Sequence, residues 1–384
     1  MLYVLMTSTF LLSLASCMVI PYYALIMDKQ LHVPIFYIGC ILGIANFLQF
    51  GFSIFGTNFQ NYCGNYYSLA FSLIIRLLGF LLIATFHSYL TILGIFISSI
   101  GAALYFPIAK CLIVEYSDKS RILINIAVFN SLLTSGMLLG PAVGAAMLYY
   151  QQNRLILYSS SILLAILVIA NLFFLKKMKS HKKPHTQVDK VSLTPEVQLL
   201  LVLQAVFVLL FIGYQNFIAL YLAKTNLSLY PIVAASTCIV GICQPFFVSK
   251  IKQLNQLHIM FLSFFCLACS FLIFAAIGSL YFLFAYVFIA AALATIAEIA
   301  LFLKIDCTVS DLYKNHVTYI FGLSRFICGL GLLIGNLGAG FIYGLFKANV
   351  HYYWVTMGVI TLLVSIVLLL ALKTRMYNMR YIAC

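Results

Sequence analysis

Apolar residues gather in long runs that recur along the whole chain. Each run holds about twenty or more residues, enough for a helix to cross ~30 Å of hydrocarbon. Because lipid offers the backbone no hydrogen-bond partners, each run is expected to be helical. The pattern predicts twelve transmembrane helices, six on each side of one hydrophilic segment. The predicted spans are 2–27, 35–57, 67–86, 89–113, 122–149, 155–175, 197–222, 229–249, 258–278, 280–304, 318–346 and 353–372.

Composition supports a protein embedded in the lipid bilayer. The chain has 384 residues, of which 64% are hydrophobic and 8% charged, and this excludes a soluble globular protein. The net charge of +14 does not indicate nucleic-acid binding, because the basic residues lie in short loops and form no patch interleaved with aromatic residues. The cysteines are scattered singly and suggest no disulfides.

The loops between the spans predict the topology. With the amino terminus placed in the cytoplasm, the cytoplasmic segments hold fifteen lysines and arginines and the opposite segments hold four. Cytoplasmic loops carry such an excess, so both termini are expected in the cytoplasm. Residues 1–10 lack the positive charge of a signal peptide, so the first span is expected to be retained. We expect a multi-pass protein of the bacterial inner (cytoplasmic) membrane.

The two sets of six spans are related by one sequence offset. Adding 195 carries Gln49 onto Gln244, and the same offset carries Gly136 and Gly140 onto Gly331 and Gly335. One offset that links several helix pairs predicts two parallel repeats around a central site. The expected fold is all-α, with two pseudo-symmetric six-helix bundles. The predicted parts are an N-terminal bundle at 1–175, a basic cytoplasmic linker at 176–196 and a C-terminal bundle with a short cytoplasmic tail at 197–384.

The fifth span carries a motif of glycines and one proline, Gly136-x-x-x-Gly140-Pro141-x-x-Gly144. Glycines four residues apart lie on one helical face and let another helix approach closely. The proline removes an amide donor and bends the helix. A packing seam of small residues would give the same spacing. The combination resembles the antiporter signature of the major facilitator superfamily, especially of its twelve-helix drug:proton antiporters.

A second resemblance extends over the second to fifth spans and the eleventh. Gln49-Phe50-Gly51 and Arg76-Leu-Leu-Gly79 look like the corresponding region of bacterial multidrug-resistance exporters. That family carries a charged loop after its second helix, and Gly64 aligns with the loop's later glycine. Here Asn61 replaces the aspartate, so the loop is degenerate and loses its charge-assisted contacts. The resemblance implies efflux by an antiporter, with protons as candidate coupling ion; proton coupling does not follow from the family name alone.

Charged residues inside the spans are few, and an intramembrane charge is a functional-site candidate. Glu298 and Arg325 lie ~10 Å from the same membrane side and could form either a static ion pair or a switch that protonation or substrate breaks. Arg76 has no acidic residue at comparable depth in its half. It would need water, carbonyl oxygens or an anionic substrate.

Neutral polar residues complete the predicted cavity. Individually, such residues more often form hydrogen bonds between helices. Together they indicate a central cavity for a partly polar ligand. These candidates are Gln49, Gln244, Tyr23, Gln215, Asn216 and Asn130.

Together with these residues, the resemblance implies a secondary active transporter that exports a small organic molecule by alternating access and works as a monomer. Lipophilic drugs are one substrate class, and an anionic metabolite such as a polycarboxylate siderophore is the alternative. A non-transporting receptor or scaffold with a transporter fold is the second alternative, which the degenerate loop keeps open. A membrane enzyme would need clustered His, Asp or Cys, which the sequence lacks. No metal, cofactor or nucleic-acid partner is expected.

Overall fold

The computed structural model is built almost entirely from helices. It describes residues 2–53, 55, 59, 62–117, 122–149, 153–174, 193–224, 254–276, 283–312, 317–346 and 349–382. Within these ranges, nine helices are long and apolar enough to cross a membrane, and shorter apolar helices cover Ile35–Gly51 and Ser131–Gly144. The predicted span 229–249 and most of the predicted linker lie outside the described residues.

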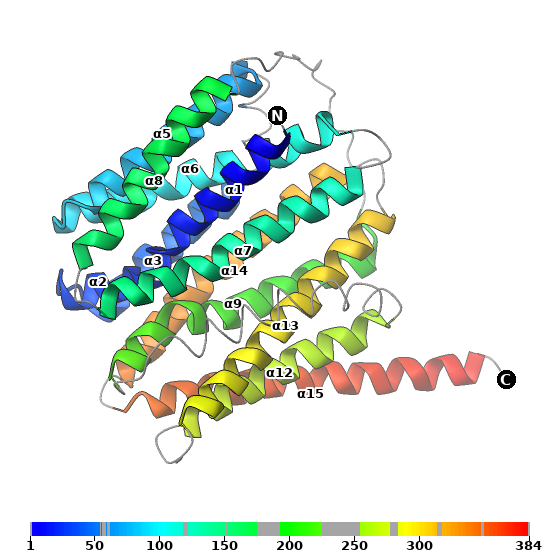
Figure 1. Ribbon diagram of the computed structural model, residues 1–384. Coiled ribbons are helices and arrows are strands. Elements are labelled where there is room, and N and C mark those ends of the chain that lie inside the picture. The colour runs from blue at the N-terminus through cyan, green and yellow to red at the C-terminus, as the bar shows by residue number, and fades with distance from the viewer. Residues whose placement is uncertain are drawn as a thin grey trace.

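The helices follow the predicted spans closely. The first half contains α1 (Leu2–Cys17), the 3₁₀ turn η1 (Ile20–Tyr22), α2 (Tyr23–Lys29), α3 (Ile35–Gly51), α5 (Asn65–Ile83), α6 (Ser88–Glu115), α7 (Ile122–Tyr149) and α8 (Asn153–Phe174). The second half contains α9 (Pro195–Lys224), α12 (Gln256–Ala276), α13 (Leu283–Leu312), α14 (Val317–Leu345) and α15 (His351–Ile382). Both termini lie at the right-hand ends of their helices in Figure 1.

Several of the predicted spans have different limits in the structure, among them 353–372, which continues as α15 to Ile382. The span 2–27 is broken between α1 and α2, where Pro21 sits in a 3₁₀ turn because it has no amide hydrogen to continue the helix. The span 280–304 continues as α13 to Leu312. Hydropathy marks only the part of a helix that lies in lipid, so it cannot show where the helix ends beyond the membrane.

Each half contains a closely packed helix pair at the equivalent place. In the first half α1 packs along α7, and in the second α9 packs along α14. A methyl group added to Gly136 would lie 2.5 Å from the carbonyl oxygen of Phe10, and one added to Gly140 would lie 2.8 Å from that of Leu14. Only glycine permits so close an approach of two helices.

The same contacts recur in the second half at the offset of 195. A methyl group added to Gly331 would lie 2.6 Å from the carbonyl oxygen of Ala205. One added to Gly335 would meet the carbonyl oxygen of Leu209. Ala205 and Leu209 lie 195 residues after Phe10 and Leu14. The repeat predicted from the sequence is therefore visible in three dimensions, both in the glycines and in the backbone atoms that they contact.

The two halves meet along α3 and α14. A methyl group on Gly39 would lie 2.6 Å from the carbonyl oxygen of Asn336 and 3.0 Å from the Cα of Gly340. Near the same end of this seam, the rings of Phe36 and Phe341 are 6.5 Å apart. The α2 helix packs on α9 and adds a further contact between the halves.

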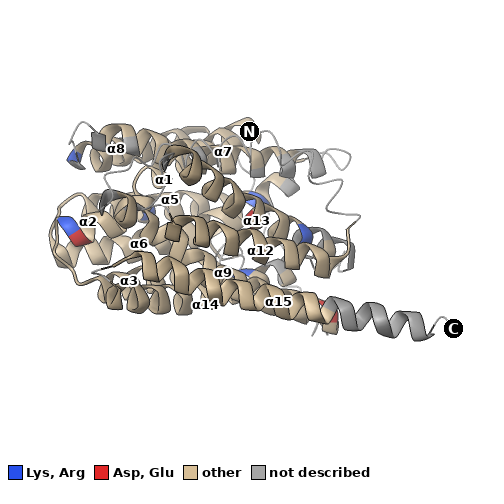
Figure 2. Cartoon of the chain, turned by 90° about the horizontal axis from the view of Figure 1, so that it is seen from below, with Lys and Arg blue, Asp and Glu red and all other residues tan. Residues whose placement is uncertain are grey.

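The outer surface of the helices is apolar. Large side chains such as Phe173 and Tyr89 are about four-fifths exposed, at 77% and 80%. Figure 2 shows few charged residues along the helices, which are tan over most of their length. A surface of this kind is stable only in contact with lipid, and it agrees with a membrane-spanning bundle.

Candidate functional site

Arg76 is the most deeply buried charge among the described side chains of the first half. It lies near the middle of α5 and is 3% exposed. Its Nε donates a hydrogen bond of 3.0 Å to the Ser16 hydroxyl on α1. Its guanidinium lies over the ring of Phe106 on α6, 5.9 Å from the ring centroid. The Nη1 nitrogen is buried and has no hydrogen-bond partner.

Close packing of α5 against α6 holds Arg76 in place. A methyl group added to Gly101 would lie 2.8 Å from the Arg76 amide nitrogen and 2.9 Å from the Ser72 carbonyl oxygen, so the two backbones nearly touch here. This contact fixes where the guanidinium can reach. Among the described residues, no carboxylate lies within ion-pair distance of it.

Two tyrosine hydroxyls lie within electrostatic range of this guanidinium. Tyr23, the first residue of α2, is 6% exposed, and its hydroxyl lies beside the Ser98 side chain on α6. Tyr105 on α6 is fully buried, and its hydroxyl is 3.3 Å from the hydroxyl of Thr9. Of the predicted site residues, the structure thus brings Arg76 and Tyr23 together. The sequence did not single out Ser16, Phe106 or Tyr105.

Glu298 is the corresponding acidic residue of the second half. It is half-buried on α13, within electrostatic range of the Tyr214 hydroxyl on α9, which has no hydrogen-bond partner. Arg325 is half-buried on α14, and its guanidinium is 6.0 Å from the Phe50 ring centroid across the seam between the halves. No ion pair joins Glu298 to Arg325, both of which are described, so the expected static pair is not observed.

The predicted amide side chains differ in burial and in hydrogen bonding. Asn216 is buried and donates a 2.6 Å hydrogen bond to Asn336, which itself donates to the Leu332 carbonyl on α14. The bond therefore ties α9 to α14. Gln215, the residue before Asn216 on α9, is exposed although its neighbours along the helix are buried. Gln49 is half-buried on α3.

Other predicted site residues are only partly described. Gln244 and Asn61 lie outside the described residues, and of Asn130 only the backbone, within α7, is described. Gly64 precedes α5 with φ 81°, a conformation that favours glycine. Pro141 lies inside α7, and its carbonyl accepts a 2.8 Å hydrogen bond from the Tyr22 hydroxyl. Gly144 packs beside it, against the backbone of Met18.

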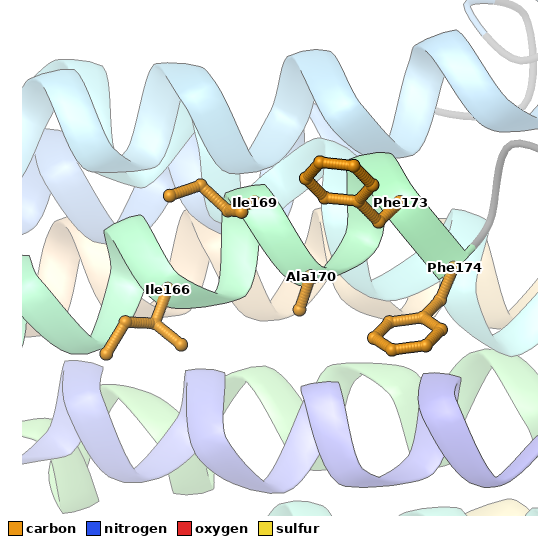
Figure 3. Close-up of a pocket in the computed structure, with 5 residues that line it drawn as sticks. All are labelled: Ile166, Ile169, Ala170, Phe173 and Phe174. Atoms are coloured by element: carbon orange, nitrogen blue, oxygen red, sulfur yellow. The ribbon is translucent and has the colours of Figure 1, made fainter.

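An apolar groove of about 560 Å³ lies on α8, away from all these residues. Figure 3 shows its five lining side chains, all carried by this one helix. Ile169 and Phe173 among them are more than half exposed. Because the groove offers no charged or polar side chain and lies on the outer surface, we assign it to lipid contact rather than to a polar substrate.

The chain was compared with known proteins. A family model described as the Major Facilitator Superfamily matches residues 5–306. A Bacillus subtilis (strain 168) protein described as an uncharacterized MFS-type transporter, YhjO, is 25% identical over 366 residues, which cover 89% of this chain and 86% of that protein.

Solved transporters share the fold at low sequence identity. A POT family transporter in complex with 5-aminolevulinic acid superposes with a TM-score of 0.81 at 13% identity, covering 96% of this chain and 95% of the other. The nucleoside transporter NupG gives 0.75 at 14% identity, covering 96% and 99%. The neighbours do not single out the drug:proton antiporter branch. The family model, the helix order and the repeated helix pairs agree, and the chain belongs to the Major Facilitator Superfamily of membrane transporters.

Proposed function

We propose that this protein is a secondary active transporter that exports a small organic molecule by alternating access. The observation that carries the proposal is the pair of glycine contacts, α1 on α7 and α9 on α14, repeated at an offset of 195. Each half is held together by its own closely packed helix pair. Two such units, 1–175 and 197–384 joined by the linker 176–196, can rock against each other while each moves as a body.

The motif of the fifth span gives the proposed direction. Gly136, Gly140 and Gly144 let α7 lie directly on α1, and Pro141 interrupts the amide donors of α7 beside that contact. This arrangement favours export through its resemblance to the antiporter signature. We place both termini in the cytoplasm and the bundle in the bacterial inner membrane, because the predicted cytoplasmic loops carry most of the basic residues.

Protons are the coupling ion in this proposal. Glu298 is the one acidic residue well inside a predicted span, and it faces a buried tyrosine. A carboxyl group in such surroundings can take up and release a proton as the site opens to either side of the membrane. The structural neighbours support a small solute as cargo, since they include a POT family transporter in complex with 5-aminolevulinic acid and the nucleoside transporter NupG.

The proposal is tested by comparing the culture medium of cells that lack the gene with that of their parent. Untargeted metabolite analysis should find at least one small molecule that is depleted from the medium of the deletion strain. Complementation with the wild-type gene should restore it. Identical media under several growth conditions, including iron limitation and added lipophilic cations, would contradict export and favour an importer or a non-transporting scaffold.

A further inference from the structure

The charge of Arg76 lacks a counter-ion in the part of the chain that the structure describes. Its contacts are one serine hydroxyl and the face of one aromatic ring. A guanidinium has five N–H donors, and burial of a charge without a partner is costly in a membrane. The contacts observed leave Nη1 unsatisfied. The arginine is therefore unfavourable for the fold as it stands, and a ligand would relieve that cost.

A second buried polar group accompanies it. The Tyr23 hydroxyl is buried within electrostatic range of the Arg76 guanidinium and beside the Ser98 side chain, whose own hydroxyl donates to the Ile95 carbonyl. It is placed there by the chain break after α1, since Tyr23 begins α2 directly after the turn that contains Pro21. The unsatisfied Nη1 of Arg76 and a phenol from a different helix beside it point to a shared acceptor on a ligand.

The second half shows that the fold does not need this polar cluster. The offset of 195 carries Ser16 onto Phe211 on α9. Phe211 stacks on Phe207 of the same helix with ring centroids 5.6 Å apart. The offset carries Arg76 onto Phe271 on α12, whose ring centroid is 5.9 Å from that of Trp354 on α15. Aromatic side chains thus stand at the positions related to Ser16 and Arg76. The arginine in the first half is a specific addition to the repeated architecture.

We propose that Arg76 and Tyr23 bind an oxyanion group, a carboxylate or a phosphate, of the transported molecule. This inference rests on the proposed transport function and names its substrate class. The planar guanidinium matches the two oxygens of such a group, and the phenol donates to one of them. Ser16 positions the guanidinium by accepting the bond from Nε, which leaves Nη1 for the ligand.

The site is closed in this structure. Arg76 and Tyr23 are buried, whereas Phe106 at the edge of the cluster is partly exposed. Its ring lies over the guanidinium, so a ligand that approaches from this side must displace it. Pro107 follows it inside α6 and removes one amide donor from that turn of the helix. A ligand that enters here replaces the ring face with two charge-assisted hydrogen bonds.

The depth of the site selects a solute over a lipid. Arg76 lies eleven residues after the start of α5 and seven before its end, or ~16 Å and ~10 Å along the helix. The phosphate of a lipid headgroup remains near the membrane surface and does not reach this depth. The oxyanion therefore belongs to a molecule that enters between the helices.

The test uses thermal unfolding of the purified full-length protein in detergent. The probes are citrate, benzoate and inorganic phosphate at constant ionic strength, with the neutral analogues triethyl citrate and benzamide. At least one oxyanion should raise the Tm of the wild type, and its neutral analogue should not. R76Q should weaken that binding roughly 10- to 100-fold, the effect of losing hydrogen bonds to a charged group. Y23F should weaken it about tenfold for the same reason.

Arg154 provides the matched control. It is an exposed arginine on α8 whose guanidinium lies 5.7 Å from the Phe86 ring centroid, so it shares the aromatic contact but not the burial. R154Q should bind like the wild type. If R76Q does not fold, Y23F decides the outcome. The proposal would be overturned if an oxyanion raised the Tm of the wild type and of the folded variant equally. It would also be overturned if none of the three oxyanions raised the Tm of the wild type.

Two further outcomes separate this site from its alternatives. Stabilisation by phosphatidylglycerol added to the detergent micelles, abolished in R76Q, would assign the site to a lipid headgroup and overturn the proposal. Binding to the isolated protein does not depend on transport. Oxyanion binding without any exported compound would therefore contradict the proposed function alone, and export of a compound that lacks an acidic group would contradict this site alone.

Discussion

Two neighbouring side chains on α9 have opposite surroundings although both are amides. Asn216 is buried and bonded to Asn336, while Gln215 is exposed within the bundle. Asn216→Ala would leave the Asn336 carbonyl oxygen without its donor. We expect a loss of about 1 kcal/mol in the free energy of unfolding, seen as a lower Tm in detergent.

Gln215→Ala is the control for this prediction. It should leave the Tm unchanged, because no hydrogen bond to another helix is lost. Because Gln215 is one of the predicted cavity residues, the variant should alter export instead. A Tm that falls equally in both variants would show that the Asn216–Asn336 bond is not what ties α9 to α14.

Glu298 carries the proposed proton coupling. Glu298→Gln keeps the size of the side chain but cannot exchange a proton, so proton-driven export should be abolished while downhill exchange of substrate continues. The assay is transport of the compound found in the medium comparison, in membrane vesicles with and without a pH gradient. Asp28→Asn serves as control, because Asp28 lies beside Lys29 at the end of α2. Intact pumping in the Glu298 variant would make that residue structural.

The sequence predicted some of these residues for a clear physical reason. A charge in an apolar span stands out, and Arg76 and Glu298 were found in this way. Ser16 and Phe106 were not, because serine and phenylalanine occur throughout the spans and only the rotation of each helix decides which of them meets Arg76. The same uncertainty explains the absent Glu298–Arg325 pair. Equal depth along two helices does not make their side chains face each other.

At the scale of elements, the close helix pairs depend on single glycines. An added methyl group on Gly140 would lie 2.8 Å from atoms of Cys17 and Leu14, and Gly335 on α14 is tighter still. Gly140→Ala and Gly335→Ala should each destabilise the protein by about 1–3 kcal/mol, since the helices must move apart. Thermal unfolding measures the loss.

The same helix offers a matched substitution. A methyl group on Gly338 of α14 meets nothing within 4 Å. Gly338→Ala should therefore keep or slightly raise the Tm, because alanine favours a helix more than glycine does. If Gly335→Ala and Gly338→Ala behave alike, close approach of α9 and α14 is not important for stability.

Hydropathy predicted where the helices lie better than where they end. The span 122–149 coincides with α7, because both its limits are set by the change from apolar to polar residues. The break between α1 and α2 was missed, although Pro21 is visible in the sequence. A proline near the end of a long apolar run bends some helices and interrupts others. Here the helix is interrupted, and the separate helix α2 packs on α9.

At the scale of the whole molecule, the relation between the two halves could be predicted from the sequence. The contact between them along α3 and α14 could not. Related halves leave matching residues at a constant offset, which a single sequence reveals. The contact of α3 with α14 joins residues of different halves that share no such relation. It follows from how the halves dock, and the sequence alone carries no rule for that.

The most direct test of the account is whether the halves must part for transport to occur. Phe36 and Phe341 lie at one end of the seam with rings 6.5 Å apart, and both are exposed. Both would be replaced by cysteine in a variant that lacks the native cysteines, and then joined with a short, reducible bis-thiol reagent. In the control, cysteines replace Phe52 and Phe55 and are joined by the same reagent. The rings of these two residues are 5.5 Å apart, and both lie within the first half. Our account predicts that export stops when the halves are joined, resumes on reduction, and continues throughout in the control; export that continues with the halves joined would contradict alternating access.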